Sequence, residues 1–288
     1  MHQIIERQNE DNMLRLQFAA RYCYNRAEAI NNFIWLFSIL SGATYVVLAT
    51  MPETVQLAVP LALDILAGIL EWRFVKNITL ASSLRAYFDA YVFDLNWEGI
   101  GKIELQTLNE RAIRIAERHY NEAQIQMKHC SQDDPPGVRD WYELPPDLPE
   151  NDVIYECQRQ NSWWNQRLWK KRLFRNIILC TIICAVIGIV IGALNKEANI
   201  WRLRALICFI TILMKLAEFL ISNIKYYLLS TKIDAVIENL AESRTTDNTI
   251  KLQKMLDDRR AMPVLERNRI HKRFASILSR TYQKTNVY

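Results

Sequence analysis

Long apolar stretches separated by polar segments dominate the sequence. The four stretches are residues 33–51, 55–70, 177–194 and 201–224. The first and third contain no charged residue, the second contains only Asp64, and the fourth has Lys215 and Glu218 in its interior. A helix needs roughly 20 mainly apolar residues to cross the hydrocarbon core of a bilayer. Helices buried in a soluble bundle usually keep a polar face, which the first and third stretches lack. The pattern therefore predicts four transmembrane helices arranged in two hairpins.

The polar segments also show helical periodicity. Residues 4–31 predict one helix that leads into the first span, and residues 71–94 are expected to continue the second span. Residues 105–129 predict an amphipathic helix, and residues 225–262 predict a helix that continues the fourth span. Prolines cluster in residues 131–150, which indicates a loop. The expected fold class is all-α: an integral membrane protein with a helical cytoplasmic domain.

Charge gives an orientation to these elements. Lys and Arg are concentrated before the first and third spans and after the fourth, so the positive-inside rule places both termini and the middle segment in the cytoplasm. A long polar stretch precedes the first span, and we expect no cleaved signal peptide. The expected segments are a cytoplasmic N-terminal helix (1–32), a transmembrane hairpin (33–73), a cytoplasmic helical region with the proline-rich loop (74–176), a second hairpin (177–224), and a cytoplasmic C-terminal helix with a basic tail (225–288).

Composition excludes several classes of protein. Seven Gly and 8 Pro in 288 residues are too few turn formers for a many-stranded β-sheet protein. The 6 Cys have neither the spacing of a disulfide framework nor that of a metal site, and the 4 His are scattered. No phosphate-binding loop and no pairing of a nucleophile with a base is recognisable. We therefore expect no enzyme, no metal and no cofactor.

The fourth span carries a row of polar residues. Thr211, Lys215, Glu218 and Ser222 recur every three or four positions and therefore share one helix face. A charge at the bilayer centre costs about 2.5–3.5 kcal/mol even on the most lenient scale, so this face should contact protein or water. Two interpretations stay open. One is an internal ion pair of Lys215 with Glu218 or with Asp64, and the other is a pore-lining face in a homo-oligomer.

Small residues mark a second candidate face in the membrane. Gly188 and Gly192 form a small-xxx-small pattern in the third span. This spacing lets two helix backbones approach closely and predicts a helix-packing contact. The pattern does not distinguish a contact within one chain from a contact between chains.

Arginine and aromatic residues gather in two places outside the spans. Guanidinium groups and flat rings together suit the phosphates and bases of nucleotides. The alternative is that Trp and Arg beside a span simply anchor it at the membrane interface. The candidate ligand-binding residues are Arg7, Arg139, Trp141, Tyr142, Arg159, Trp164 and Arg167.

Several of these residues belong to motifs that resemble a known family. The motifs are Ile5-Glu6-Arg7-Gln8-Asn9, Met13-Leu14, Ala19-Ala20-Arg21, Trp141-Tyr142, Cys157-Gln158-Arg159-Gln160-Asn161, Trp163-Trp164 and Arg167-Leu168. In this order, and together with two separated hairpins, they resemble the SMODS-associated four-transmembrane (S-4TM) effectors. The likeness covers nearly the whole chain.

The resemblance implies a role in a bacterial antiphage system of the CBASS type. In such a system a CD-NTase (SMODS) nucleotidyltransferase makes a cyclic oligonucleotide. An effector then assembles in the inner membrane and makes it leak, which causes abortive infection. The rival hypothesis is a membrane protein that forms no pore. It would be an ion-coupled channel or transporter that uses Asp64, Lys215 and Glu218, or a scaffold that docks a cytoplasmic partner.

Overall fold

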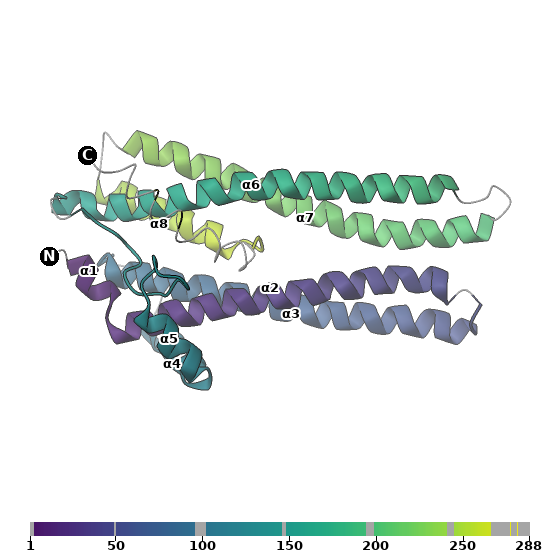
Figure 1. Ribbon diagram of the computed structural model, residues 1–288, viewed down its shortest axis with the longest axis horizontal. Coiled ribbons are helices and arrows are strands. Elements are labelled where there is room, and N and C mark those ends of the chain that lie inside the picture. Colours follow the sequence, from purple (N-terminus) through teal and green to yellow (C-terminus); the bar gives the residue numbers. More distant parts are fainter. Residues whose placement is uncertain are drawn as a thin grey trace. The chain divides into compact units, whose positions relative to one another are not determined.

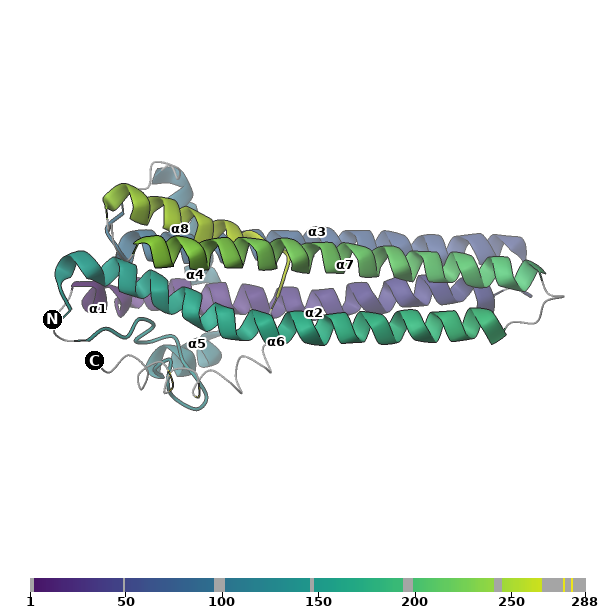
Figure 2. The same cartoon turned by 90° about the horizontal axis from the view of Figure 1, so that it is seen from above.

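A computed structural model of the chain describes residues 3–48, 50–95, 102–145, 148–193, 199–240 and 245–265, together with residues 277 and 281. Helices dominate these residues, and no strand occurs among them, as the sequence predicts (Figure 1). The elements are α1 (Gln3–Gln8), α2 (Asp11–Val47), α3 (Glu53–Val92), α4 (Lys102–Arg118), α5 (Tyr120–Lys128), α6 (Glu150–Ala193), α7 (Asn199–Leu240) and α8 (Thr246–Ala261). Figure 2 shows the same elements from above.

Three of the expected helices are interrupted. The helix predicted over residues 4–31 breaks between α1 and α2, where the Asn9 amide donates to Asp140 Oδ1 at 2.7 Å and accepts from the Asp140 backbone N–H at 3.0 Å. The helix predicted over residues 105–129 breaks at His119, whose backbone leaves the helical region (φ −117°, ψ 42°). The His119 ring instead packs against Tyr22, with 4.2 Å between the ring centroids.

The single helix predicted over residues 225–262 is also wrong. Helix α7 ends at Leu240, and α8 starts at Thr246. Thr245 is the N-cap of α8: its backbone is extended, and its hydroxyl accepts a hydrogen bond from the Asn248 backbone N–H. A side-chain oxygen in this position satisfies one of the N–H groups that a helix start leaves without a partner.

The chain divides into two compact units, and the helices α2, α3, α6 and α7 supply residues to both. Unit 1 consists of Met1–Arg26, Asn77–Leu168 and Leu228–Tyr288, and unit 2 consists of Ala27–Lys76 and Trp169–Tyr227. In the described residues, α1, α4, α5, α8 and the loop after α5 all belong to unit 1.

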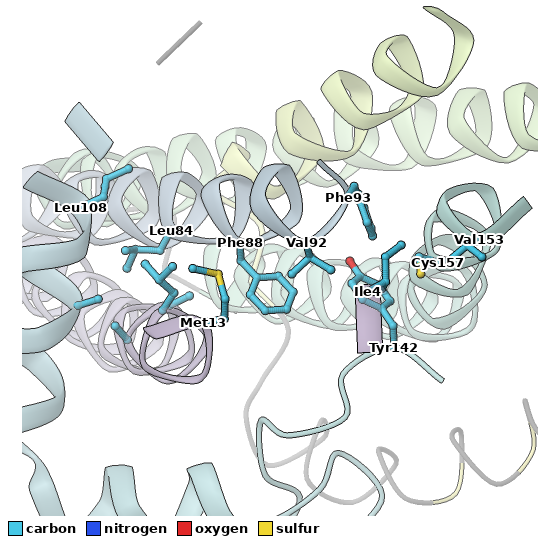
Figure 3. Packing of buried hydrophobic residues seen from close by; sticks show 14 residues of the cluster. Ile4, Met13, Leu84, Phe88, Val92, Phe93, Leu108, Tyr142, Val153 and Cys157 are labelled. Atoms are coloured by element: carbon cyan, nitrogen blue, oxygen red, sulfur yellow. The ribbon is translucent and has the colours of Figure 1, made fainter. Parts of the chain in front are cut away.

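Unit 1 has a well-packed hydrophobic core. Met13 of α2, Leu84 and Phe88 of α3 and Cys157 of α6 are fully buried in one cluster, and Tyr142 of the proline-rich loop packs into it (Figure 3). A second cluster joins α2 to α4, α5 and the loop, and a third joins α6 to α7 and α8. Burial of this much apolar surface is the main force that holds a helical unit together.

The proline-rich loop folds back on helix α5. The Val138 N–H donates to the Gln126 carbonyl at 2.9 Å, and the Gly137 N–H donates to the Cys130 carbonyl at 2.8 Å. A Cβ atom at Gly137 would lie 1.8 Å from the His129 carbonyl oxygen, so only glycine allows this approach. This part of the loop is thereby held against α5, and Trp141 and Tyr142 lie a few residues further along the same loop.

Unit 2 exposes large apolar side chains on each of its long helices. Among them are Phe33, Leu36 and Ile39 of α2, Leu57, Leu61 and Ile65 of α3, Ile182, Val186 and Ile189 of α6, and Leu213, Met214 and Ile221 of α7. Two helical stretches in the described residues, Glu53–Val92 and Asp152–Ile189, are long and apolar enough to cross a membrane. Only 11% and 22% of their most apolar windows are buried, which fits helices that face lipid better than helices of a soluble core.

Candidate functional site

The first candidate site is the set of charged residues in unit 2. Lys215 of α7 hydrogen-bonds and forms an ion pair with Glu71 of α3, and it lies 3.3 Å from Glu218. The Glu71 and Glu218 side chains remain 46% and 71% exposed. Lys215 thus joins two helices that are far apart in the sequence, while both of its carboxylate partners stay accessible.

Glu71, and not Asp64, is the second partner of Lys215. Asp64 lies seven residues before Glu71 on α3, about 10 Å along the helix axis, so one lysine does not reach both carboxylates. In the described part of the chain, the exposed Asp64 side chain has no hydrogen bond and no ion pair. Gly68, one turn further on the same face, is also open, because a Cβ atom there would meet nothing within 4 Å.

The other residues predicted in the spans have varied surroundings. Ser222 is half-buried, and Gly188 is open, since a Cβ atom there would meet nothing within 4 Å. The side chain of Thr211 and the surroundings of Gly192 lie outside the described residues. In the described part of unit 2, Gly188 therefore makes no close contact with another helix of its own chain.

Sequence reasoning missed a buried amide pair in unit 2. Asn176 Nδ2 of α6 donates to Asn223 Oδ1 of α7 at 3.2 Å, and both side chains are buried. Asn223 follows Ser222 directly, but it does not share the face of the predicted polar row. Interhelical amide bonds of this kind hold helices together in membranes.

The predicted ligand-binding residues of the loop and of α1 have structural partners in unit 1. Arg139 Nε donates to the Met127 carbonyl at 3.2 Å, and Arg7 forms an exposed ion pair with Asp94 at 3.4 Å. Trp141 is half-buried, and the Arg85 guanidinium lies 4.0 Å from its ring centroid.

The predicted residues on α6 do not gather around one point. Arg159 Nε donates to Glu156 Oε2 at 2.8 Å, and Arg159 Nη2 donates to Glu156 Oε1 at 2.7 Å. The exposed Arg167 stacks on Trp163, with 3.7 Å from its guanidinium carbon to the ring centroid, and Trp164 is half-buried. The structure therefore brings Trp141 and Tyr142 together with a new arginine, Arg85, and leaves Arg159 and Arg167 in local pairs.

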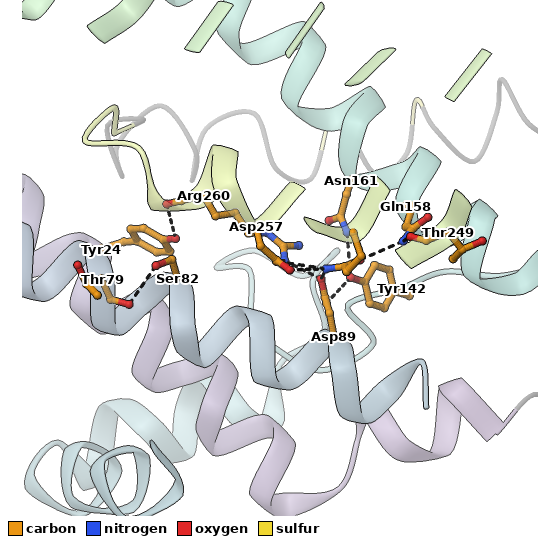
Figure 4. A network of polar contacts seen from close by, with 11 residues as sticks. Tyr24, Thr79, Ser82, Asp89, Tyr142, Gln158, Asn161, Thr249, Asp257 and Arg260 are labelled. Atoms are coloured by element: carbon orange, nitrogen blue, oxygen red, sulfur yellow. Dashed lines mark hydrogen bonds and ion pairs between the residues drawn. The ribbon is translucent and has the colours of Figure 1, made fainter. Parts of the chain in front are cut away.

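The most extensive polar cluster of unit 1 surrounds Asp89 of α3, which is 1% exposed (Figure 4). The Tyr142 hydroxyl donates to Asp89 Oδ1 at 2.7 Å and accepts from Asn161 Nδ2 at 2.9 Å. On the other oxygen, Asp89 accepts from Gln253 Nε2 at 2.9 Å and from Arg260 Nη1 at 2.6 Å. One buried carboxylate thus joins α3, the loop and α8.

Burial and neighbouring charges change the acidities in this cluster. Burial, followed by the charge of Asp89, raises the pKa of Tyr142 well above its usual value. Burial raises the pKa of Asp257 to about 7, although the nearby Arg260 acts in the opposite direction. Burial alone would lower the pKa of Arg260, but Asp89 and Asp257 outweigh it and raise that pKa. Arg260 is therefore permanently charged, whereas Asp257 can gain a proton near neutral pH.

No sequence motif indicates this cluster. Asp89, Gln253, Asp257 and Arg260 match no motif, and they meet only because α8 is a separate helix. The capping residue Thr245, followed by Asp247 in the first turn, is the signal that could have revealed the start of α8.

These features define a class of protein: an all-helical chain with apolar helices suited to a membrane and a packed helical unit rich in buried polar contacts. The chain belongs to the family described as the SMODS-associating 4TM effector domain, whose model matches residues 2–283. The resemblance seen in the sequence motifs is thereby confirmed. The family links the chain to SMODS nucleotidyltransferases and to CBASS. Comparisons with the curated proteins and with the solved structures found no match.

Proposed function

We propose that this protein is a pore-forming effector of a CBASS antiphage system. A cyclic oligonucleotide binds its cytoplasmic region, copies of the chain assemble in the bacterial inner membrane, and the resulting leak causes abortive infection. In this proposal, four transmembrane helices form two hairpins, with both termini in the cytoplasm. The exposed apolar side chains of α2, α3, α6 and α7 support four spans, and the distribution of Lys and Arg supports the orientation.

The observation that carries the proposal is the open carboxylate of Asp64 in the second span. Asp64 is exposed and has no hydrogen-bond or ion-pair partner among the described residues. The neighbouring side chains on α3, such as Leu61 and Ile65, are exposed and apolar. A charge that faced lipid at this depth would be strongly unfavourable. A second copy of the chain or a water-filled passage would remove this cost, and both are present in an oligomeric pore.

The charged cluster of Lys215, Glu71 and Glu218 also supports the proposed pore. Its two carboxylates, Glu71 and Glu218, remain exposed although Lys215 contacts both. Glu71 shares the α3 face of Asp64 and Gly68, by their spacing of seven and three residues. A polar strip along α3 and α7 is the arrangement expected of helices that line water in an assembly.

A leakage assay tests this proposal. The purified full-length protein is placed in liposomes that contain a self-quenching dye, and cyclic di-AMP, cyclic GMP–AMP and cyclic tri-AMP are added one at a time. We expect release with one of them, and loss of release for Asp64→Leu. Leu61→Ile is the matched control, because Leu61 is exposed on the same helix and carries no charge. The absence of release with every nucleotide contradicts the pore.

The non-pore alternative is favoured by the direct link between Lys215 and Glu71, which suits a purely structural pair. Replacing Lys215 and Glu218 together by Leu separates the two functions. Loss of toxicity with normal membrane insertion supports the pore, whereas failure to insert supports a structural pair in a transporter or scaffold. Insertion is measured by protease protection of the full chain in membranes.

A further inference from the structure

Polar residues of three helices in unit 1 lie along one interface, which we call the seam. Each helix contributes three residues spaced over two turns, so that the three share a face. They are Gln17, Arg21 and Tyr24 of α2, Ser82, Arg85 and Asp89 of α3, and Gln253, Asp257 and Arg260 of α8. Hydrogen bonds join the faces: the Tyr24 hydroxyl donates to the Arg260 carbonyl at 3.1 Å, and Arg260 donates to Asp89 (Figure 4).

Arg85 is the unusual member of this seam. It shares the α3 face of Ser82 and Asp89, by its spacing of three and four residues from them, and the charges of Asp89 and Arg260 both act on it. Its guanidinium stacks on Trp141 at 4.0 Å, but in the described residues it forms no hydrogen bond and no ion pair. Stacking uses the flat face of a guanidinium and leaves its N–H groups, which lie in the plane, available to an acceptor.

Arg21 adds a second positive charge beside Arg85. Arg21 Nη1 donates to the Pro136 carbonyl at 2.7 Å and to Gln126 Oε1 at 3.2 Å, both of them neutral acceptors. No ion pair of Arg21 occurs in the described part of the chain. Burial, and then the charge of Arg85, lowers the pKa of Arg21 to about 10. Burial, and then the charge of Arg260, lowers the pKa of Arg85 to about 10.

Gln17 supplies an independent sign of a missing ligand. It is 0% exposed, and neither its amide nitrogen nor its amide oxygen has a hydrogen-bond partner among the described residues. Buried amides without partners are rare because the lost hydration is not replaced. Gln17 precedes Arg21 by four residues and therefore lies on the same face of α2.

The charges of the seam do not balance. Three guanidinium groups, those of Arg21, Arg85 and Arg260, are present against the carboxyl groups of Asp89 and Asp257. Because the pKa of Asp257 is raised to about 7, this carboxyl is only partly ionised near neutral pH. The seam residues therefore carry a surplus positive charge among themselves, and the further carboxylate that acts on Arg21 is that of the exposed Glu122. Arg21 and Arg85 are half-buried, where a bound anion is screened less than at a fully exposed surface.

We propose that Arg21, Arg85 and the amide of Gln17 form the site at which unit 1 binds a phosphate group of the cyclic oligonucleotide, with Trp141 holding Arg85 in place. This site rests on the proposed function and specifies where its ligand binds. Guanidinium groups pair with phosphate oxygens through two parallel N–H donors, and the Gln17 amide adds a neutral donor. The bound phosphate removes the repulsion between Arg21 and Arg85 and supplies a partner to Gln17.

Residues of this site contact several elements of unit 1, so ligand binding can change their arrangement. Arg21 holds the loop through Pro136, and Arg85 contacts the loop through Trp141. Asp89, one turn after Arg85, joins the same loop to α8 through Tyr142 and Arg260. An anion that draws Arg21 and Arg85 together therefore acts on α2, α3, α8 and the loop at once.

The test uses full-length protein in detergent and radiolabelled cyclic di-AMP, cyclic GMP–AMP and cyclic tri-AMP in equilibrium dialysis. We expect one of these to bind, and Arg85→Gln and Gln17→Met to weaken its affinity by about 10- to 100-fold, as expected for loss of hydrogen bonds to a charged ligand. Arg114→Gln is the matched control, because Arg114 is an exposed arginine on α4 of the same unit. It should bind like the wild-type protein.

Thermal unfolding without ligand provides a second measurement. Arg85→Gln removes a repelled charge, and Gln17→Met replaces an amide that has no partner, so both should raise the melting temperature of the free protein. A role in stability alone predicts the reverse, a lower melting temperature with unchanged affinity, and that result overturns the site.

The remaining outcomes separate the site from the function. Nucleotide binding that is unchanged in Arg85→Gln and Arg21→Gln overturns the site and leaves the proposed function standing. A wild-type protein that binds none of the nucleotides overturns both. Nanodiscs of phosphatidylglycerol and of phosphatidylcholine form the lipid arm, and inorganic phosphate forms another. Stabilisation by phosphatidylglycerol alone, lost in Arg85→Gln, would assign the site to a lipid headgroup and overturn the nucleotide.

Discussion

The hydroxyl of Tyr142 donates a hydrogen bond of 2.7 Å to Asp89 inside unit 1, and it accepts another from Asn161. This one hydroxyl joins the proline-rich loop to α3 and α6. Asp89 in turn accepts a hydrogen bond from Arg260 of α8. The proline-rich loop and α8 are therefore linked through the buried interior of the unit.

Removal of that hydroxyl should destabilise the protein. Tyr142→Phe deletes the donor to Asp89 and the acceptor of Asn161 while it keeps the ring in the core, and we expect a loss of about 1–3 kcal/mol in the free energy of unfolding. Thermal and chemical unfolding of the full chain in detergent measure the loss. Tyr120→Phe is the control, because Tyr120 is exposed on α5. Equal stability of the two variants would contradict the role of the network.

Asp257 should make the stability of the protein depend on pH. Because burial raises its pKa from 3.8 to about 7, the folded protein keeps a proton that the unfolded chain releases above about pH 4. The contribution of this carboxyl to stability is therefore fully present below about pH 4 and is lost as the pH rises to about 7. Between pH 5 and pH 8, wild-type protein should lose about 1–3 kcal/mol more than Asp257→Asn, which does not titrate.

The neighbouring aspartate provides the control for this measurement. Asp258 is exposed, so Asp258→Asn should follow the pH dependence of the wild-type protein. The unfolding free energy of each variant is measured at several pH values in one buffer system. If Asp257→Asn kept the full pH dependence of the wild-type protein, Asp257 would not be the titrating group.

Local sequence features were sufficient for the elements that depend on periodicity alone. Uncharged runs such as residues 177–194 indicate apolar helices whatever their neighbours are, and the proline cluster at residues 131–150 indicates a loop. The breaks at Asn9 and His119 were not predictable in the same way. Each depends on a partner from a distant segment, Asp140 in one case and Tyr22 in the other.

Polar partners were harder to predict than helices. The spacing of Lys215 and Glu218 correctly places them on one face of α7, but only the packing of α3 against α7 shows that Glu71 joins them. Similarly, Arg85 and Gln17 carry no motif. These two residues stand out because they lack hydrogen-bond partners among the described residues, and the spacing of residues in a sequence does not show such a lack.

The pairing of Lys215 with Glu71 predicts a specific energetic coupling. In a double-mutant cycle, Lys215→Met and Glu71→Gln should show an interaction of about 0.5–3 kcal/mol, because each charge loses its partner in either single variant. The parallel cycle with Asp64→Asn should show none, since Asp64 lies two turns away and does not contact Lys215. Unfolding of the full chain in detergent provides the four free energies of each cycle. A larger coupling energy of Lys215 with Asp64 than with Glu71 would contradict the pairing of Lys215 with Glu71.

Two glycines with opposite surroundings predict opposite effects of the same substitution. Gly137→Ala places a Cβ atom 1.8 Å from the His129 carbonyl oxygen, so the loop must shift, and we expect a loss of about 1–3 kcal/mol in stability. Gly188→Ala places its Cβ atom where nothing lies within 4 Å, so the stability of the isolated chain should stay within about 0.5 kcal/mol of the wild-type value.

The oligomeric state in detergent and the dye release from liposomes are measured for the same variants. If Gly188 packs against a second copy, Gly188→Ala weakens assembly and release while the chain unfolds normally. Unchanged assembly and release would exclude Gly188 from such a contact, because close approach of two backbones at a glycine does not tolerate an added methyl group.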